Sequence, residues 1–142
     1  MTVSAILKNK DATTITLPSD ATLAQACKTL ARHRIGTVLI VDEGKLAGIV
    51  SERDIVRIMA ASGGAALNDT VASCMTKNIV TCTTADTVAL VMERMTNGRF
   101  RHIPIVENDQ LVGIVSIGDV VKFRIAEVER EAQEIRDYIS TT

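Results

Sequence analysis

The sequence predicts an α/β chain built from two copies of one small unit, and three observations support this. Residues 15–59 align with residues 80–124 at a constant offset of 65, without a gap and with 13 of 45 positions identical. Each copy shows the same order of strand-like and helix-like patterns. Two copies are too few for a solenoid. We therefore expect one compact pair of β-α-β-β-α units related by pseudo-twofold symmetry, with helices covering one face of each short sheet.

Each copy opens with a short β-branched run, residues 14–17 in the first and 79–82 in the second, which is typical of a strand. A helix follows, because four apolar residues in each copy recur at helical spacing. They are Leu23, Ala26, Cys27 and Leu30, and then Val88, Val91, Met92 and Met95. Thr22 and Gln25 have the spacing of a capping box, whereas Thr87 is followed at the matching place by Leu90 and cannot form one.

Two apolar runs joined by turn residues predict a β-hairpin in each copy. The runs and turns are residues 37–41, 43–44 and 46–50, and then residues 102–106, 108–109 and 111–115. Pro104 lacks an N–H group, so it indicates that its strand lies at a sheet edge or begins there. A second helix begins at Ser51 in the first copy and at Ser116 in the second.

These patterns divide the chain into four segments. Residues 1–62 hold the first copy with its lead-in, 63–69 form a linker rich in small residues, 70–124 hold the second copy, and 125–142 form a C-terminal helical extension. The helix leading into the extension carries apolar residues at alternating spacings of four and three, with charged flanks. They are Val121, Ile125, Val128, Ala132, Ile135 and Ile139. This stripe favours self-association, and we expect a homodimer.

Composition excludes several classes of function. Of the 142 residues, 46% are hydrophobic and 23% charged, which suits a folded core, but only 2% are aromatic, so stacking of bases on rings is disfavoured. A net charge of −1 provides no field that attracts nucleic acid. The chain lacks an apolar stretch long enough to span a membrane, and its N-terminus lacks an export signal. We expect no nucleic-acid or membrane partner, and a cytoplasmic location.

The clearest motif is Gly-Ile-Val-Ser-x-x-Asp, which runs from Gly48 to Asp54 and again from Gly113 to Asp119. One interpretation is structural: Ser followed three residues later by Asp caps a helix N-terminus. The other is functional, because a helix N-terminus attracts phosphate and a carboxylate binds the hydroxyls of a ribose. On this second interpretation the two glycines allow a ligand to approach the strand closely. The residues by themselves leave both interpretations open.

Basic residues differ between the two copies. Arg53 lies inside the first motif where the second has Gly118, and Arg101 and His102 replace Gly36 and Thr37 at the start of the hairpin. If these segments converge between the copies, Arg53, Arg101 and Lys77 clamp anionic oxygens. The alternative is that they are solvated surface charges.

Taken together, the duplicated motif, the tandem order of elements, the run Arg-His-Ile-Pro-Ile at residues 101–105 and the lead-ins at residues 2–3 and 70–71 resemble the CBS-domain pair, or Bateman module. The resemblance covers about residues 13–124. It implies that the cleft between the repeats binds an adenine nucleotide or a related ligand such as AMP, ATP, NAD(H) or S-adenosylmethionine.

The resemblance also implies roles for particular residues. Asp54 and Asp119 would hold ribose hydroxyls, and Ser51 and Ser116 with Arg53 would face phosphate. Adenine would rest against the start of a hairpin strand, while Thr13 and Asn78 would border the two sites. The strand residues are Ile35, Gly36 and Thr37 at one site and Arg101, His102, Ile103 and Pro104 at the other.

Candidates for catalysis are few. His33 ends a helix, where a cation suits the helix dipole, and His102 has no neighbouring Cys or His that would complete a metal site. Cys27, Cys74 and Cys82 fall in no paired spacing and are expected to be reduced residues in or near the core. We therefore expect a regulatory binding module without a catalytic cofactor or metal, acting on an unidentified protein. The alternative is a ligand-free dimeric adaptor whose motif residues only cap helices.

Overall fold

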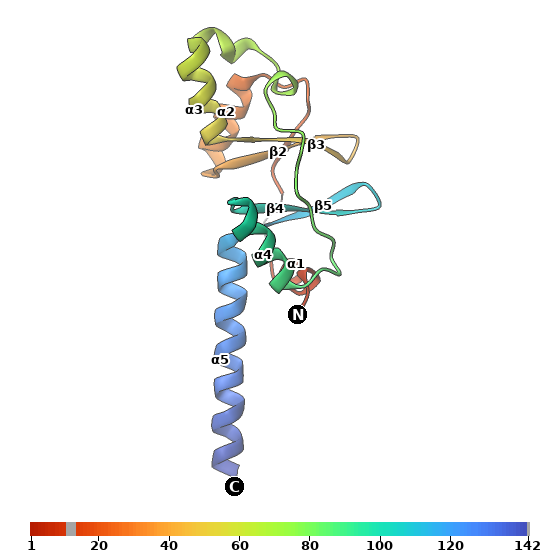
Figure 1. Cartoon of the computed structure of the whole chain (residues 1–142), viewed down its shortest axis with the longest axis vertical. Coiled ribbons are helices and arrows are strands. Elements are labelled where there is room, and N and C mark those ends of the chain that lie inside the picture. The colour runs from red at the N-terminus through yellow and green to blue at the C-terminus, as the bar shows by residue number, and fades with distance from the viewer. Residues whose placement is uncertain (11–13, 142) are drawn as a thin grey trace.

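The computed structural model describes residues 1–10 and 14–141, and within them the chain forms two stacked α/β units. Each unit places a small sheet toward the other unit and its helices on the outside (Figure 1). The interface between the two sheets is called the seam below. This is the duplicated α/β arrangement that the sequence predicts.

The first repeat forms a sheet of three strands in the order β1-β2-β3. Strand β1 (Thr16–Leu17) lies parallel to β2 (Thr37–Asp42), which pairs antiparallel with β3 (Lys45–Ser51). The turn between β2 and β3 has positive φ at Glu43 and Gly44, as the hairpin pattern predicts.

Helices α2 (Leu23–His33) and α3 (Glu52–Ser62) cover this sheet. The Thr22–Gln25 capping box is present at the start of α2. On the predicted stripe of α2, Leu23, Ala26 and Leu30 are buried and Cys27 is half-buried.

The second repeat pairs β4 (His102–Glu107) with β5 (Gln110–Ser116), joined by a turn with positive φ at Asn108 and Asp109. Helix α4 (Val88–Gly98) precedes the hairpin, and α5 (Ile117–Thr141) follows it as one continuous helix that includes the predicted extension. Thr87 caps α4 without a capping box, as expected. Met92 was predicted on the buried stripe of α4 but is 39% exposed, so the buried face is narrower than the sequence indicates.

The strand predicted at residues 79–82 is reduced to one parallel bridge between Cys82 and Ile105. In the first repeat the equivalent strand pairs Thr16 with Leu39. Pro104 occupies the position of Leu39 within β4, so its strand has no N–H there to bond a longer partner. Pro104 therefore lies inside an edge strand and not at its start.

The segment before each repeat packs on the other repeat. Helix α1 (Val3–Lys8) donates from the Val3 N–H to the Asp86 carbonyl at 2.9 Å, and Val3 lies in the core of the second repeat. The linker forms 3₁₀ helices η1 (Gly63–Asn68) and η2 (Val71–Ser73). Val71 donates to the Ala21 carbonyl at 2.8 Å and lies in the core of the first repeat. The two lead-ins thus cross between repeats in a pseudo-symmetric way.

The two repeats have separate aliphatic cores. Residues Val38 and Ile40 of β2 face the first core, and Ile103 and Ile105 of β4 face the second. Because side chains alternate along a strand, Leu39 and Pro104 project from the opposite sheet faces, toward the seam, and both are buried. The described residues contain no helix that is both long and apolar enough to cross a membrane.

Candidate functional site

Both motif carboxylates cap a helix. Asp54 accepts from the Ser51 backbone N–H at 3.0 Å while its own N–H donates to Ser51 Oγ at 3.1 Å. Asp119 and Ser116 repeat this pair of bonds at 2.9 and 3.1 Å. In each case Oδ2 makes the capping bond, so Oδ1 is left for other contacts. The structural interpretation of the motif therefore holds in both repeats without excluding the functional one.

Asp54 keeps one oxygen available. Its Oδ1 lies 3.7 Å from a guanidinium nitrogen of Arg57, which is longer than a hydrogen bond, and the Arg57 side chain is 71% exposed. An exposed and distant ion pair of this kind is weak and easily exchanged. The Asp54 carboxylate can therefore accept a hydrogen bond from a hydroxyl group through Oδ1 without losing its helix cap.

Asp119 is held by a cation from elsewhere in the chain. Lys10 Nζ donates to Asp119 Oδ2 at 2.7 Å and to the Ile114 carbonyl at 2.7 Å. Burial raises the pKa of Asp119, but the hydrogen bonds from Lys10 and Ser116 outweigh burial, and the net pKa is lowered. The chain's own ammonium group thus neutralises the second motif, whereas the first motif has no equivalent contact among the described residues.

A cavity of about 170 Å³ lies at the seam. It joins Ile49 of the first motif to residues of the crossing segment and the second repeat: Thr76, Asn78, Ile79, Val80, Phe100 and His102. Thr76 and Ile49 exchange backbone hydrogen bonds at 2.9 Å, which fixes the crossing segment against β3. Ser51 and Asp54 do not line the cavity, but Ile49 is two residues before Ser51, about 7 Å along a strand, so the cavity wall and the helix cap belong to the same end of β3.

His102 is the titratable group of this cavity. Burial lowers its pKa, and the nearby positive charge of Lys10 lowers it further, against an opposing effect of Asp119. The imidazole is therefore neutral at pH 7 and presents one donor and one acceptor nitrogen. Together with the Asn78 amide, it gives the cavity, whose other lining residues are apolar except for Thr76, two groups able to recognise the edge of a heterocyclic base.

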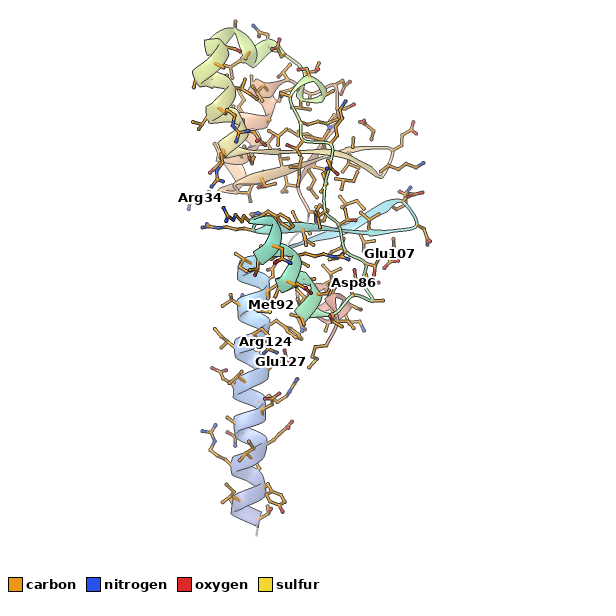
Figure 2. All side chains as sticks on the ribbon, in the orientation of Figure 1. Arg34, Asp86, Met92, Glu107, Arg124 and Glu127 are labelled. Carbon is orange, nitrogen blue, oxygen red and sulfur yellow. The ribbon has the colours of Figure 1, made fainter. Side chains whose placement is uncertain are left out.

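The first and second motifs share a backbone feature that places the hairpin starts beside them. The Gly36 carbonyl accepts from Glu52 N–H at 2.9 Å, and the Arg101 carbonyl accepts from Ile117 N–H at 2.8 Å. Each hairpin start thus meets the N-terminus of the second helix of its own repeat, whereas the basic-residue hypothesis concerns a convergence between the two repeats, which these bonds do not test. Figure 2 shows Arg34, which ends α2, at the level where the two repeats meet.

The remaining predicted residues lie in different environments. Arg53, Lys77 and Arg101 are exposed, while Ile35, Gly36 and Thr37 are half-buried at the start of β2. The structure does not bring Ile103 to the cavity: it is fully buried in the core of the second repeat. Pro104 is buried toward the seam, and Thr13 lies outside the described residues.

The motif glycines make room for side chains of this chain and not for a ligand. A Cβ atom on Gly48 would lie 2.4 Å from Met75 Sδ, and one on Gly113 would lie 3.1 Å from a methyl carbon of Leu7. Met75 belongs to the segment after η2, and Leu7 belongs to α1. The glycines therefore let the crossing lead-ins pack against β3 and β5, which corrects the expectation of close ligand approach.

Sequence reasoning missed the apolar walls of the cavity and the cation at Asp119. Thr76 and Ile79 flank the predicted Lys77 and Asn78, so a search around those two positions would have found them. Lys10 lies outside the aligned repeats, and only the crossing of α1 brings it to the second repeat.

Other cavities and clusters contain few of the predicted residues. A cavity of about 540 Å³ between α1 and α5 is lined by Lys10, Asp119 and Lys122, among others. Another, of about 640 Å³, lies along the outer side of α2 and is lined by none of the predicted site residues.

Within residues 1–10 and 14–141, no group of three or more His, Cys, Asp or Glu side chains is arranged to hold a metal. Burial raises the pKa of the Cys82 thiol, which keeps it protonated.

Comparison with known proteins gives a consistent result. The CBS-domain family profile, described as "CBS domain", matches residues 6–61 and 71–126. A CBS-domain containing protein from Agrobacterium tumefaciens is 44% identical with a TM-score of 0.81, covering 87% of this chain and 99% of that chain. Among curated Arabidopsis thaliana relatives at 33% identity, this chain spans 71% of the length of one and 22% of another.

Two similar structures contain adenosine compounds. The CBS domain pair of protein MJ0100, solved with 5-methylthioadenosine and S-adenosyl-L-methionine, is 29% identical with a TM-score of 0.76 and covers 89% of this chain and 98% of that chain. A CBS domain protein from Pyrobaculum aerophilum, complexed with AMP, is 27% identical with a TM-score of 0.74 and covers 84% and 89%.

Proposed function

This chain belongs to the CBS-domain family, and we propose that it is a regulatory module that binds one adenosine-containing ligand per chain, at the seam beside Asp54. The observation that carries the proposal is the pairing of an available Asp54 oxygen with a cavity lined from both repeats. The compounds bound by similar CBS pairs support the ligand class.

The cavity supports a base-binding role. Four of its seven lining residues are apolar and three are polar, namely Thr76, Asn78 and His102, and apolar walls with a few polar groups are typical of a small-molecule site. A volume of about 170 Å³ is below that of pockets that enclose a whole ligand, so only the base enters and the sugar stays outside. The sugar then lies toward the N-terminus of α3, where its hydroxyl groups donate hydrogen bonds to Asp54.

The phosphate position follows from the same arrangement. The partial positive charge at the N-terminus of α3 attracts an anion, and the exposed Arg53 provides a cation there, although the Glu52 and Asp54 N–H groups are already bonded to the Gly36 carbonyl and Ser51 Oγ. Glu52 and Asp54 in the first turn of the helix oppose this attraction. We therefore propose that AMP or another ligand with few phosphate charges binds better than ATP.

The second motif is proposed to be closed in the free protein. Lys10 already neutralises Asp119 and occupies the adjacent Ile114 carbonyl. Lys10 binds Oδ2 and leaves Oδ1 available, but it neutralises the carboxylate, so a ribose hydroxyl would gain less at Asp119 than the roughly 1.5–3 kcal/mol of a hydrogen bond to an unpaired charge. Only one of the two pseudo-equivalent sites then fills.

Regulation follows from ligand contacts in both repeats. A ligand that binds Ile49 on one side and His102 on the other stabilises one relative placement of the repeats. It can act on a partner only through such a difference in affinity between two states. The chain therefore acts as a sensor, and it has no proposed catalytic role.

Titration calorimetry with AMP, ATP, NADH and S-adenosylmethionine tests this proposal. We expect heat with at least one of them at a stoichiometry of one per chain. Asp54→Ala should weaken that affinity roughly tenfold to a hundredfold, because it removes a charged acceptor. Asp119→Ala is the matched control, since it removes the equivalent helix cap but leaves the seam cavity intact. Absence of heat with all four ligands would contradict the proposal.

A ligand-free dimeric adaptor is the second candidate, and the capping bonds of both carboxylates favour it. The two candidates differ in their response to nucleotide. A sensor melts at a higher temperature when ligand is added, whereas an adaptor melts at the same temperature. A dimer whose melting temperature does not change across the nucleotide panel would establish the adaptor.

A further inference from the structure

Helix α5 extends far beyond the body of the protein. It has 25 residues, about 37 Å at 1.5 Å per residue, and its C-terminal half runs past α1 and α4 into solvent (Figure 1). The heptad-like stripe lies exposed along it: Val121, Ile125, Val128, Ile135 and Ile139 are each 49% to 65% exposed. An apolar row of this length on a surface marks an interaction site.

The opposite face of α5 is the one that packs on the body. Val120 is 1% exposed, Glu127 is 8% exposed, and Phe123 packs against the core of the second repeat. If the stripe occupies heptad positions a and d, these three residues fall at c and f. Figure 2 shows Arg124 and Glu127 on the part of α5 beside α4. The body therefore leaves the a/d face exposed at Val121, Ile125, Val128 and Ile135.

We propose that α5 pairs with α5 of a second copy of this chain as a parallel, in-register, two-stranded coiled coil. The charges that flank the stripe support this occupant. In the heptad, Arg124 and Glu131 are at g, and Glu129 and Arg136 are at e. A parallel coiled coil brings each g residue beside the e residue five positions later in the other helix. Arg124 then meets Glu129, and Glu131 meets Arg136, so both of these pairs have opposite charges.

The same charges disfavour the antiparallel arrangement. With the helices fully overlapped in opposite directions, e residues face e residues and g residues face g residues. Glu129 would then lie beside Glu129 of the second copy, Glu131 beside Glu131, and Lys122 beside Arg136. In the single chain Arg124 reaches Glu127 at 3.4 Å, but its side chain is 56% exposed and can turn to the second helix. The pairing therefore places both bodies at the same end of the dimer.

Disulfide trapping tests the orientation in the full chain. Ile135→Cys places one thiol at a d position, so a parallel in-register pair brings two copies of residue 135 together, whereas the antiparallel pair sets residue 135 opposite residue 125. Mild oxidation should give a cross-linked dimer beyond any formed by the wild type with its three native cysteines. Arg130→Cys, at the outward f position, is the matched control. No additional cross-link, or equal cross-linking of both variants, would overturn the proposal.

Charge exchange tests the flanking pairs by sedimentation. Glu129→Lys sets two like charges beside each other on each side of the coiled coil and should weaken dimerisation roughly tenfold. Arg124→Glu combined with Glu129→Lys restores opposite charges and should return the dissociation constant to that of the wild type. An unchanged constant in the single variant, or a wild type that stays monomeric at all concentrations, refutes the coiled coil. Circular dichroism confirms that each variant is folded.

Discussion

Asp54 and Asp119 are the same residue in the same motif, yet they differ in what surrounds them. Both cap a helix through one oxygen, but Asp119 also binds Lys10 at 2.7 Å, while the nearest cation to Asp54 is an exposed arginine at 3.7 Å. The distinction comes from one side chain that lies outside the repeated segment. Identical motif residues therefore do not imply identical sites.

Lys10→Met tests this distinction. The variant keeps the length and apolar stem of lysine but removes the ammonium group that neutralises Asp119. We expect calorimetry with AMP to change from one binding event per chain to two. Lys8→Met is the control, because Lys8 is exposed at the end of α1, two residues before Lys10. A stoichiometry that stays at one in Lys10→Met would show that Lys10 does not close the second site.

The lowered pKa of Asp119 predicts a pH dependence of stability. Burial raises this pKa, and the bonds from Lys10 and Ser116 lower it by more, so the folded value lies below 3.8. The unfolded chain then binds the proton more readily, and the stability gained from the pair is lost as the pH falls from 3.8 through the folded pKa. Urea unfolding across this range should show a shallower loss in Lys10→Met than in the wild type. Equal slopes would contradict the assignment.

At the scale of elements, the two repeats differ where the strand that an element pairs with carries a different residue. The first strand of the second repeat is reduced to one bridge because Pro104 offers no N–H to it. The two hairpins are nearly identical. Both have a two-residue turn with positive φ, and both shift register at the equivalent place, between Ile40 and Val41 in β2 and between Ile105 and Val106 in β4. The hairpins therefore depend on local sequence, whereas the strand beside the second hairpin is shortened because Pro104 stands where the first repeat has Leu39.

Gly48→Ala and Gly113→Ala form a matched pair of predictions about these strands. A Cβ on Gly48 would clash with Met75 Sδ and Cγ at 2.4 and 2.6 Å, while one on Gly113 would meet only a terminal methyl of Leu7 at 3.1 Å. Overpacking typically costs about 1–3 kcal/mol, and we expect Gly48→Ala to be the more destabilising of the two. Urea unfolding gives the comparison. A larger loss for Gly113→Ala would show that Met75 moves aside freely.

At the scale of the whole molecule, the crossing lead-ins tie the two repeats into one cooperative unit. Val3 completes the core of the second repeat and Val71 completes the core of the first, and both are fully buried. A single repeat of about 55 residues would be marginal by itself. Neither repeat keeps a complete core when the other's lead-in is absent, so we expect them to unfold together.

Val71→Ala tests this cooperativity. The change removes two buried methyl groups from the first core and should destabilise the protein by about 2 kcal/mol. Hydrogen exchange should show a similar loss of protection in β4 and β5 of the second repeat as in β2 and β3. Val3→Ala, which truncates the second core, is the reciprocal variant. Loss of protection in one repeat alone would show that the repeats unfold separately.

Much of the fold could be predicted from residue patterns because it depends on local preferences. The hairpin turns, the Thr22 capping box and both Ser-x-x-Asp caps follow from residues a few positions apart. The exposed stripe of α5 likewise follows from helical spacing. For the candidate site, Asn78 and His102 were found and are brought to one cavity, but Ile103 was placed there by its position next to His102 and instead faces the core, because strand side chains alternate.

The sequence by itself determined the duplication, the order of elements and the family, since each depends on patterns repeated within the chain. Only the tertiary structure decided which lead-in covers which repeat, that Gly48 and Gly113 accommodate those lead-ins, and that Lys10 binds Asp119 across 109 residues. These contacts join segments distant in the chain and depend on the path of the backbone between them. No local pattern encodes such a path, which is why the difference between the two motifs emerges only in the folded molecule.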